Sequence, residues 1–261
     1  MSRMDGKVAV VSGAGSVASG IGNGRAVSIL FARAGGSVGA VDISLPNAEE
    51  TCRLCETEGG RATAVVADVS DPAGAEQAVQ TIYENFGRID ILVNNVGIVG
   101  ARGSAVDVDP DEWDDVMRVN VKSMMLMTKH CVPLMIENGG GAIVNIASVA
   151  GLLGGNPHLA YATSKGAVVN MTRAMAHHHA RSGVRVNCVA PGMVITPRVV
   201  QRGMTPESRE SRRLAAPLQT EGTAWDIAAA VFYLASDASR WVTGVVLPVD
   251  AGRSAITSSP S

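Results

Sequence analysis

The chain has 261 residues, of which 46% are hydrophobic, 18% are charged and only 3% are aromatic. Its formal net charge of −2 predicts no electrostatic attraction to nucleic acid or to an anionic membrane surface. No apolar run approaches the roughly 20 residues of a membrane span, and residues 1–7 lack the hydrophobic stretch of a signal peptide. We therefore expect a soluble cytoplasmic protein whose core is filled by small aliphatic side chains.

Apolar, β-branched runs alternate with longer helical patterns along nearly the whole chain. Strands are predicted at residues 8–11, 38–41, 64–67, 89–93, 142–147, 184–189 and 245–249. Helices are predicted at 25–34, 48–58, 72–86, 111–136, 160–181 and 224–235, with a polar, basic break at 197–213. This order predicts an α/β fold, a Rossmann-like doubly wound parallel sheet flanked by helices, with residues 1–252 as a single domain. Residues 253–261 have little to bury and are expected to form a mobile tail.

A glycine-rich loop lies between the first predicted strand and the first predicted helix. It begins at Gly13 and ends with the segment 20–24, in which glycine occupies every second position. Glycines let the backbone approach a pyrophosphate, and the following helix N-terminus supplies amide donors and the positive end of a dipole. A flexible turn would not explain so many glycines directly before a helix. The loop therefore predicts a dinucleotide site with contacts at Gly13, Ile21 and Gly22.

Asp42 ends the second predicted strand, 29 residues after Gly13. A carboxylate there can accept hydrogen bonds from both ribose hydroxyls of an adenosine, whereas it would repel a 2′-phosphate. No Arg or Lys follows within residues 43–48 to neutralise such a phosphate. Asp42 could instead only cap the following helix, but its place after the glycine loop favours the ribose role and NAD over NADP.

A second group of polar residues surrounds the helix predicted at 160–181. Tyr161 and Lys165 are four residues apart, so they share one helix face. A free tyrosine, with a pKa of about 10, exchanges protons poorly at neutral pH, and a neighbouring ammonium group lowers that pKa. Ser148 follows the fifth strand and could hold a substrate oxygen beside the phenol. The three residues predict general acid–base catalysis on an alcohol or carbonyl group.

With these motifs in place, residues 4–252 resemble the single-domain form of the short-chain dehydrogenase/reductase family. Further matches are the adenine-contacting pair Asp68–Val69, the N-N-A-G motif at 94–97 with Val96 in place of the alanine, the helix asparagine within 118–121, and the P-G-x-x-x-T turn at 191–196. The resemblance implies cofactor contacts at Asp68, Val69, Asn95, Val194, Thr196, Tyr161 and Lys165, and catalytic roles for Asn120, Ser148, Tyr161 and Lys165. It also implies a homotetramer in which the helices at 111–136 and 160–181 pair across a two-fold axis.

The glycine loop departs from the family pattern T-G-x-x-x-G-x-G. Ser12 replaces the threonine and the loop is about five residues longer. The last two pattern glycines are either Gly20 and Gly22 or Gly22 and Gly24. Only the second choice places residues 25–26 where the family's helix usually opens. A long loop is also found in the family's enoyl reductases, but those separate Tyr and Lys by six residues, and this chain separates them by three.

The resemblance implies that Ser148 orients an alcohol, Tyr161 removes its proton, Lys165 lowers the tyrosine pKa and holds the nicotinamide ribose, and Asn120 with a water relays the proton. We therefore predict an NAD-dependent oxidoreductase that interconverts a secondary alcohol, or a cyclic diol, and its ketone. The alternatives are an NADP-dependent 3-oxoacyl or carbonyl reductase and a non-catalytic nucleotide-binding regulatory protein; a family isomerase or dehydratase is more remote. Pocket residues are expected at Leu152, Leu153, His158, Met193 and Val194, together with the segment 197–213.

Two other groups of residues could suggest a metal or redox site. Cys52 and Cys55 form a C-x-x-C pair on a predicted helix, without the further ligands that zinc requires. Adjacent histidines at 177–179 point about 100° apart on a helix and do not converge on one ion. We therefore predict no metal site, with reduced thiols and partly exposed histidines in these places.

Overall fold

The computed structural model describes residues 3–256 and contains one seven-stranded parallel sheet with the strand order β3-β2-β1-β4-β5-β6-β7. The strands are β1 (Val8–Ser12), β2 (Ser37–Asp42), β3 (Arg61–Val66), β4 (Ile91–Asn94), β5 (Gly141–Ile146), β6 (Val184–Pro191) and β7 (Val246–Val249). The helices are α1 (Asn23–Arg33), α2 (Leu45–Thr57), α3 (Pro72–Phe86), α4 (Pro110–Met117), α5 (Ser123–Glu137), α6 (Leu159–His179), α7 (Pro197–Gln201), α8 (Pro206–Leu214) and α9 (Ala224–Ala235). The predicted Rossmann-like fold is confirmed.

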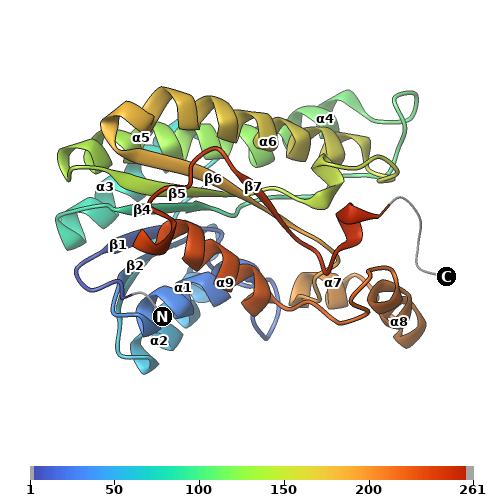
Figure 1. Ribbon diagram of the computed structural model, residues 1–261, viewed down its shortest axis with the longest axis horizontal. Coiled ribbons are helices and arrows are strands. Elements are labelled where there is room, and N and C mark those ends of the chain that lie inside the picture. Colours follow the sequence, from blue (N-terminus) through green and yellow to red (C-terminus); the bar gives the residue numbers. More distant parts are fainter. Residues whose placement is uncertain (1–2, 257–261) are drawn as a thin grey trace.

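The sheet lies between two layers of helices (Figure 1). Helices α1, α2 and α9 cover one face, where Phe31, Cys55 and Ile227 belong to one buried cluster. Helices α3, α5 and α6 cover the other face, where Ile82, Met127 and Met175 belong to a second cluster. Parallel strands covered on both faces read as continuous apolar runs, and every residue of β1 is buried.

The predicted and observed elements differ mainly at the edge of the sheet and in one long helix. Strand β3 begins at Arg61, three residues earlier than predicted, because the apolar pattern misses the polar residues of this edge strand, which pairs along the whole of β2. The helix predicted at 111–136 is interrupted by a π-helical turn, η1 (Arg118–Lys122). The basic break at 197–213 contains the short helices α7 and α8.

The direction of winding reverses beside β1, since β2 and β3 lie on one side of it and β4 to β7 on the other. Ligands of open α/β sheets bind beyond the carboxyl ends of the strands at this point. The loops after β1, β2, β4, β5 and β6 carry most of the predicted site residues, and α7 and α8 lie at the same end (Figure 1).

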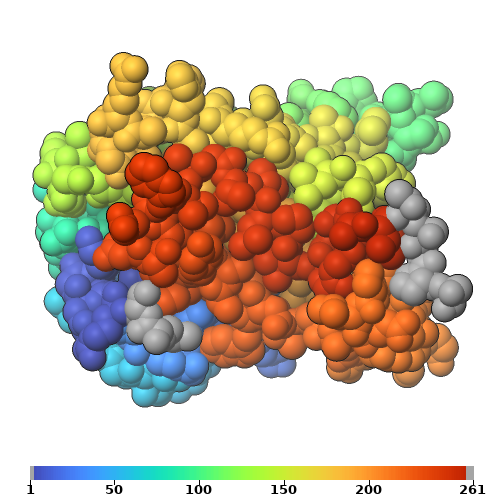
Figure 2. All heavy atoms as spheres, in the orientation of Figure 1, coloured from blue at the N-terminus to red at the C-terminus, as the bar shows by residue number. Residues whose placement is uncertain are grey.

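The α7–α8 segment packs against the residues that follow β7. Figure 2 shows the two segments, orange and dark red, in contact at one end of the molecule. The amide of Leu218 donates to the carbonyl of Ala251 at 3.2 Å. The tail predicted to be mobile is ordered where it begins. Arg253–Ala255 form a 3₁₀ turn, and the Ser254 amide donates a hydrogen bond to Asp250. Residues 257–261 of that tail lie outside the described residues.

All four cysteines, Cys52, Cys55, Cys131 and Cys188, are buried and free. Burial raises the thiol pKa of Cys52 to about 11 and that of Cys55 to about 12. Between residues 3 and 256, no group of three His, Cys, Asp or Glu side chains is placed to hold a metal ion. Over the same residues, no helix has the length and apolar character needed to cross a membrane.

Candidate active site

Tyr161, Lys165 and Ser148 come together at the carboxyl end of β5. Tyr161 lies in the first turn of α6 and Lys165 one turn later, with the Lys165 Nζ 5.8 Å from the centre of the Tyr161 ring. The buried Lys165 Nζ donates to the Ile146 carbonyl at 2.9 Å, which ties α6 to the end of β5. Ser148 follows two residues later, and its side chain lies close enough to Tyr161 to lower the pKa of the phenol. The structure thus brings the three predicted residues into one group.

The electrostatic environment of Tyr161 includes two arginines. Burial, the largest effect, raises the pKa of Tyr161, while the hydrogen bond from Ser148 and the charges of Arg202 and Arg198 lower it. Burial also lowers the pKa of Lys165 to about 8. The sequence predicts that Lys165 carries the charge that lowers this pKa. In the structure the positive charges that lower it are those of Arg202 and Arg198.

Asn120 is fully buried in the π-helical turn η1 between α4 and α5. Its Oδ1 accepts from the Ile98 amide at 2.7 Å, and its Nδ2 donates to the Ile98 carbonyl at 2.8 Å and to Ser164 Oγ at 2.9 Å. A Cβ placed on Gly97 would lie 3.3 Å from Asn120 Oδ1 and 3.2 Å from Lys165 Nζ. Asn120 therefore fixes the loop after β4 against α6, next to Lys165. Single π turns are frequent at functional sites.

The glycine loop and Asp42 form the other end of the site. Asp42 ends β2, and its carboxylate accepts from the Gly15 amide at 2.9 Å and from the Ser44 amide at 3.0 Å. Gly22 is the N-cap of α1, and a Cβ there would have no neighbour nearer than the Gly15 oxygen at 3.5 Å. A Cβ on Gly24 would overlap the Gly13 carbonyl. This geometry favours Gly22 and Gly24 as the last two pattern glycines, with Gly24 required for close packing of helix on strand.

The remaining predicted cofactor residues line the same edge of the sheet. Asn95 Nδ2 donates to the Gly13 carbonyl at 2.8 Å, which joins the loops after β4 and β1. Asp68 accepts from Ser70, chiefly its hydroxyl, and this holds the pKa of the Asp68 carboxyl below its usual value. Val69 and Val194 are buried, Ile21 is half-buried, and Thr196 is the N-cap of α7.

The predicted pocket residues are more open. Leu152, Leu153 and Met193 each expose at least a third of their surface. His158 is the N-cap residue of α6, and its Nδ1 lies 3.2 Å from the Gly100 carbonyl oxygen. Exposed apolar side chains beside a catalytic group are suited to contact a small organic molecule.

Sequence reasoning missed two arginines at the site. Arg25 is buried and donates to Thr51, to the Gly20 carbonyl and to the Asn47 carbonyl, so it anchors the long glycine loop to α2. Arg198 donates to the Gly97 carbonyl at 2.5 Å, across 101 residues of sequence. The basic character of the 197–213 segment was the only sequence signal for Arg198, and it did not indicate the contact.

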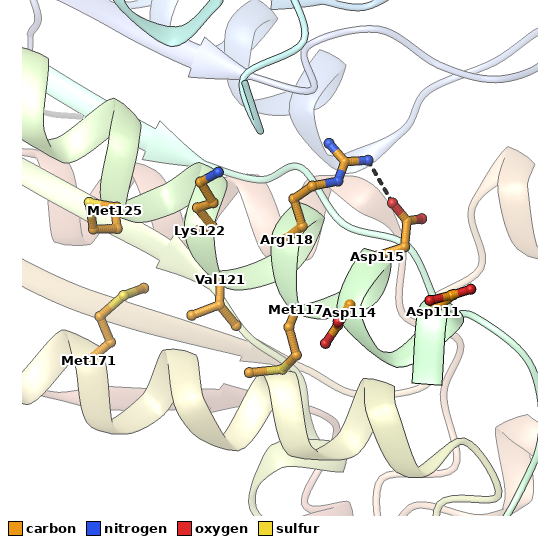
Figure 3. Close-up of a pocket in the computed structure, with 9 residues that line it drawn as sticks. All are labelled: Asp111, Asp114, Asp115, Met117, Arg118, Val121, Lys122, Met125 and Met171. Carbon is orange, nitrogen blue, oxygen red and sulfur yellow. Dashed lines mark hydrogen bonds and ion pairs between the residues drawn. The ribbon is translucent and has the colours of Figure 1, made fainter. Parts of the chain in front are cut away.

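A separate groove lies on the outer surface of α4, η1 and α5. It is lined by Asp111, Asp114, Asp115, Met117, Arg118, Val121, Lys122, Met125 and Met171 (Figure 3). Three methionines and Val121 form its apolar floor, and Arg118 pairs with Asp115 at 2.6 Å. None of the predicted catalytic residues lines this groove.

Comparison with known proteins identifies the family. A family model described as enoyl-(acyl carrier protein) reductase matches residues 16–254. A 3-oxoacyl-[acyl-carrier-protein] reductase of Thermotoga maritima is 37% identical over 250 residues, covering 96% of this chain and 98% of the relative. The chain belongs to the short-chain dehydrogenase/reductase family. The resemblance inferred from the motifs is therefore confirmed.

Two further comparisons support the same family. A 2-(R)-hydroxypropyl-CoM dehydrogenase of Xanthobacter autotrophicus is 39% identical over 253 residues, covering 96% of this chain and 99% of the relative. The solved structure of a 7α-hydroxysteroid dehydrogenase with NADH and 7-oxo glycochenodeoxycholic acid has a TM-score of 0.88 and 33% identity, covering 96% of this chain and 95% of the other. The chain is thus an oxidoreductase of a family that uses NAD(P).

The residues present fit a nicotinamide dinucleotide. The open N-cap at Gly22 leaves the first amides of α1 accessible to a phosphate. The Asp42 carboxylate lies beside the loop, held by two backbone amides, with its remaining lone pairs free for ribose hydroxyls. The loops after β1, β2 and β4 therefore follow one edge of the sheet from Asp42 toward Tyr161 and Lys165.

Proposed function

We propose that the protein interconverts a secondary alcohol, or a cyclic diol, and the corresponding ketone with NAD as cofactor. The observation that carries the proposal is the convergence of Ser148, Tyr161 and Lys165, with Asn120 bound to the adjoining loop, at the carboxyl edge of the sheet. A protein that only binds a nucleotide does not need these four groups together.

NAD, when bound, supplies the hydride acceptor and donor. Gly13, Ile21 and Gly22 would face its phosphates, Asp42 its adenosine ribose, Asp68 and Val69 its adenine, and Asn95, Val194 and Thr196 its nicotinamide half. Asp42 favours NAD because its carboxylate repels a 2′-phosphate. Arg25 is unsuited to bind that phosphate, since it is buried and three of its five N–H groups already bind Thr51 and two carbonyls.

The chain's own residues supply the proton chemistry. Ser148, whose side chain lies close enough to Tyr161 to lower its pKa, would orient the alcohol oxygen between the two hydroxyls. Tyr161 holds or releases the proton of that oxygen, and the positive charges around it stabilise the phenolate. Lys165 lies under the phenol ring and would hold the nicotinamide ribose, while Asn120 keeps the loop after β4 in place beside it.

A dehydrogenase screen over secondary alcohols and cyclic diols, with NAD and NADP in parallel, tests the proposal. We expect a higher kcat/KM with NAD, and we expect Asp42→Ala to lower it by at least about tenfold because charge-assisted hydrogen bonds to the ribose are lost. Equal or better use of NADP by the wild type would contradict the assignment of NAD.

The second candidate is an NADP-dependent 3-oxoacyl or carbonyl reductase. It is favoured by 37% identity to a 3-oxoacyl-[acyl-carrier-protein] reductase. The same screen with 3-oxoacyl thioesters and NADPH distinguishes the two candidates. We further propose a cytoplasmic homotetramer in which α5 and α6 pair across a two-fold axis.

A further inference from the structure

Arg25 holds the far end of the lengthened glycine loop. Its side chain is buried, and its Nη1 donates to the Gly20 carbonyl at 2.8 Å. The other contacts of the guanidinium group are with α2, since Nε donates to Thr51 Oγ1 at 3.0 Å and Nη2 donates to the Asn47 carbonyl at 3.3 Å. Helix α2 is therefore the support against which Arg25 fixes the end of the loop.

The beginning of the loop is fixed to the same helix. Thr51 Oγ1, which accepts from Arg25, lies 2.9 Å from the carbonyl oxygen of Ala14 and donates to it. The Ala14 amide in turn donates to the Val41 carbonyl at 3.0 Å. Arg25 and Thr51 thus form one hydrogen-bonded pair that holds both ends of the segment 15–20.

The charge of Arg25 has no carboxylate at ion-pair distance among residues 3–256. Glu50 and Asp42 act on it only over a longer distance. A guanidinium group stays protonated in proteins, and a buried charge is costly without a counter-charge. Arg25 lies in the first turn of α1, where the phosphates of a dinucleotide are expected. A bound pyrophosphate would therefore bring a counter-charge to this turn.

The loop end that Arg25 holds also lies beside α7. A Cβ placed on Gly20 would lie 3.1 Å from Pro197 Cγ. Pro197 begins α7 directly after Thr196, the residue expected at the nicotinamide half of the cofactor. By fixing Gly20, Arg25 sets how closely the glycine loop and the start of α7 approach each other.

We propose that Arg25 is a positioning residue for the dinucleotide, because it holds the lengthened glycine loop in the conformation that receives the pyrophosphate. This inference rests on the proposed function and deepens it at the cofactor site. A loop that is already ordered loses little conformational entropy when a ligand binds, whereas the loop without Arg25 would have to become ordered in the complex. Arg25 should therefore strengthen the binding of ligands that contain the pyrophosphate, but not the binding of adenosine alone.

Calorimetric titrations of the full-length protein with NAD, ADP-ribose and adenosine test the inference. Arg25→Met removes the charge and the three hydrogen bonds but keeps a long side chain. We expect this variant to bind NAD and ADP-ribose about tenfold or more weakly, because hydrogen bonds from a charged group are lost. Its affinity for adenosine, which lacks the pyrophosphate, should change by less than about twofold.

Thr51→Val is a second and milder variant, since valine has a similar shape but no hydroxyl to join Arg25 to Ala14. It should weaken ADP-ribose binding by about threefold. The double variant should lose less affinity than the product of the two single effects, because both residues act on one loop. Arg33→Met is the matched control, because Arg33 lies at the other end of α1 and pairs with Glu58; it should bind all three ligands like the wild type.

Arg25→Met that loses adenosine and ADP-ribose affinity equally, or neither, would overturn the inference and leave the proposed function standing. If Arg25→Met does not fold, unchanged ADP-ribose affinity in Thr51→Val would overturn the inference in its place. A wild type that prefers NADP would contradict the proposed cofactor, and a selective loss of NADP and ADP-ribose in Arg25→Met would still support the inference. A wild type that binds neither dinucleotide would contradict both proposals.

Discussion

At the scale of single residues, the hydroxyl of Tyr161 is the group on which the proposed proton transfer depends. Tyr161→Phe keeps the ring that lies over Lys165 but removes the hydroxyl next to Ser148. We expect kcat to fall by about 10²–10⁴-fold, as for general acid–base residues. NAD affinity, measured by fluorescence titration, should change little because Asp42 and Asp68 would hold the adenosine half. A variant that kept more than about a tenth of wild-type kcat would exclude this role.

The buried ammonium group of Lys165 should make the stability of the folded protein depend on pH. Burial lowers the pKa of Lys165 from 10.5 to about 8, so between these values the folded protein releases a proton that the unfolded chain retains. Stability therefore rises as pH increases from about 8 to 10.5. Lys165→Met lacks this contribution but fills similar space. We expect the Tm of the variant, relative to wild type, to be higher at pH 7 than at pH 10. The same Tm difference at both pH values would refute this account.

At the scale of elements, the turn from β1 into α1 contains two glycines with different requirements. Gly24→Ala places a methyl group against the Gly13 carbonyl and should lower Tm by several degrees or prevent folding. Gly22→Ala has room for its methyl group and a negative φ of −83°, so Tm should stay close to that of wild type. Calorimetry measures the Tm of both variants. An equal loss of Tm in the two would contradict the different requirements assigned to Gly22 and Gly24.

For Gly22→Ala we also expect weaker NAD binding, because the methyl group would stand where the phosphates approach the first amides of α1. Isothermal titration of NAD into this variant measures the effect. Wild-type affinity in Gly22→Ala would mean that the phosphates lie elsewhere along the loop.

Much of the fold could be predicted because the central strands are covered on both faces. Such strands appear as uninterrupted apolar runs, and β1 and β4 are buried throughout. The sequence pattern places the start of the edge strand β3 too late because Arg61 and Thr63 interrupt its apolar run. The π turn at Asn120 could not be predicted from a 3.6-residue period, since it accompanies hydrogen bonds to Ile98, 22 residues away.

Some residues of the candidate site could be predicted from the sequence and others could not. Local spacing, or a position directly after a strand, was enough to predict site roles for Tyr161, Lys165 and Asp42. The effect of Arg198 and Arg202 on Tyr161 could not be foreseen, because it depends on how the chain returns across the strand ends after β6. The local sequence pattern predicts helices, strands and short motifs, but it does not predict which loops lie against one another in the folded chain.

At the scale of the whole molecule, we expect a second copy of the chain to cover the groove of Figure 3. Its methionines come from α4, α5 and α6. In a two-fold pair of chains, the acidic residues at one end of the groove would face Lys122 and Arg118 of the second copy. Light scattering should show a tetramer at micromolar concentration. Met125→Glu, which places a charge in the groove, should give a smaller species.

Val106→Glu is the matched control, because Val106 is 93% exposed and lies outside the groove. It should leave the assembly unchanged. A wild-type protein that is monomeric at micromolar concentration would refute the tetramer. A Met125→Glu variant that remains tetrameric would show that the interface lies elsewhere on the surface.

The burial of all four cysteines should make the folded protein resistant to thiol reagents and to oxidants. Thiolate, rather than thiol, is attacked by alkylating agents and peroxide, and burial holds the thiol pKa of Cys52, Cys55 and Cys188 at about 11 or above. The folded enzyme should therefore work without added reductant and survive iodoacetamide with its activity intact. Ellman's reagent should detect almost no thiol in the native protein and four after denaturation. Rapid labelling of a cysteine before unfolding would reveal an opening motion of the helix that covers it.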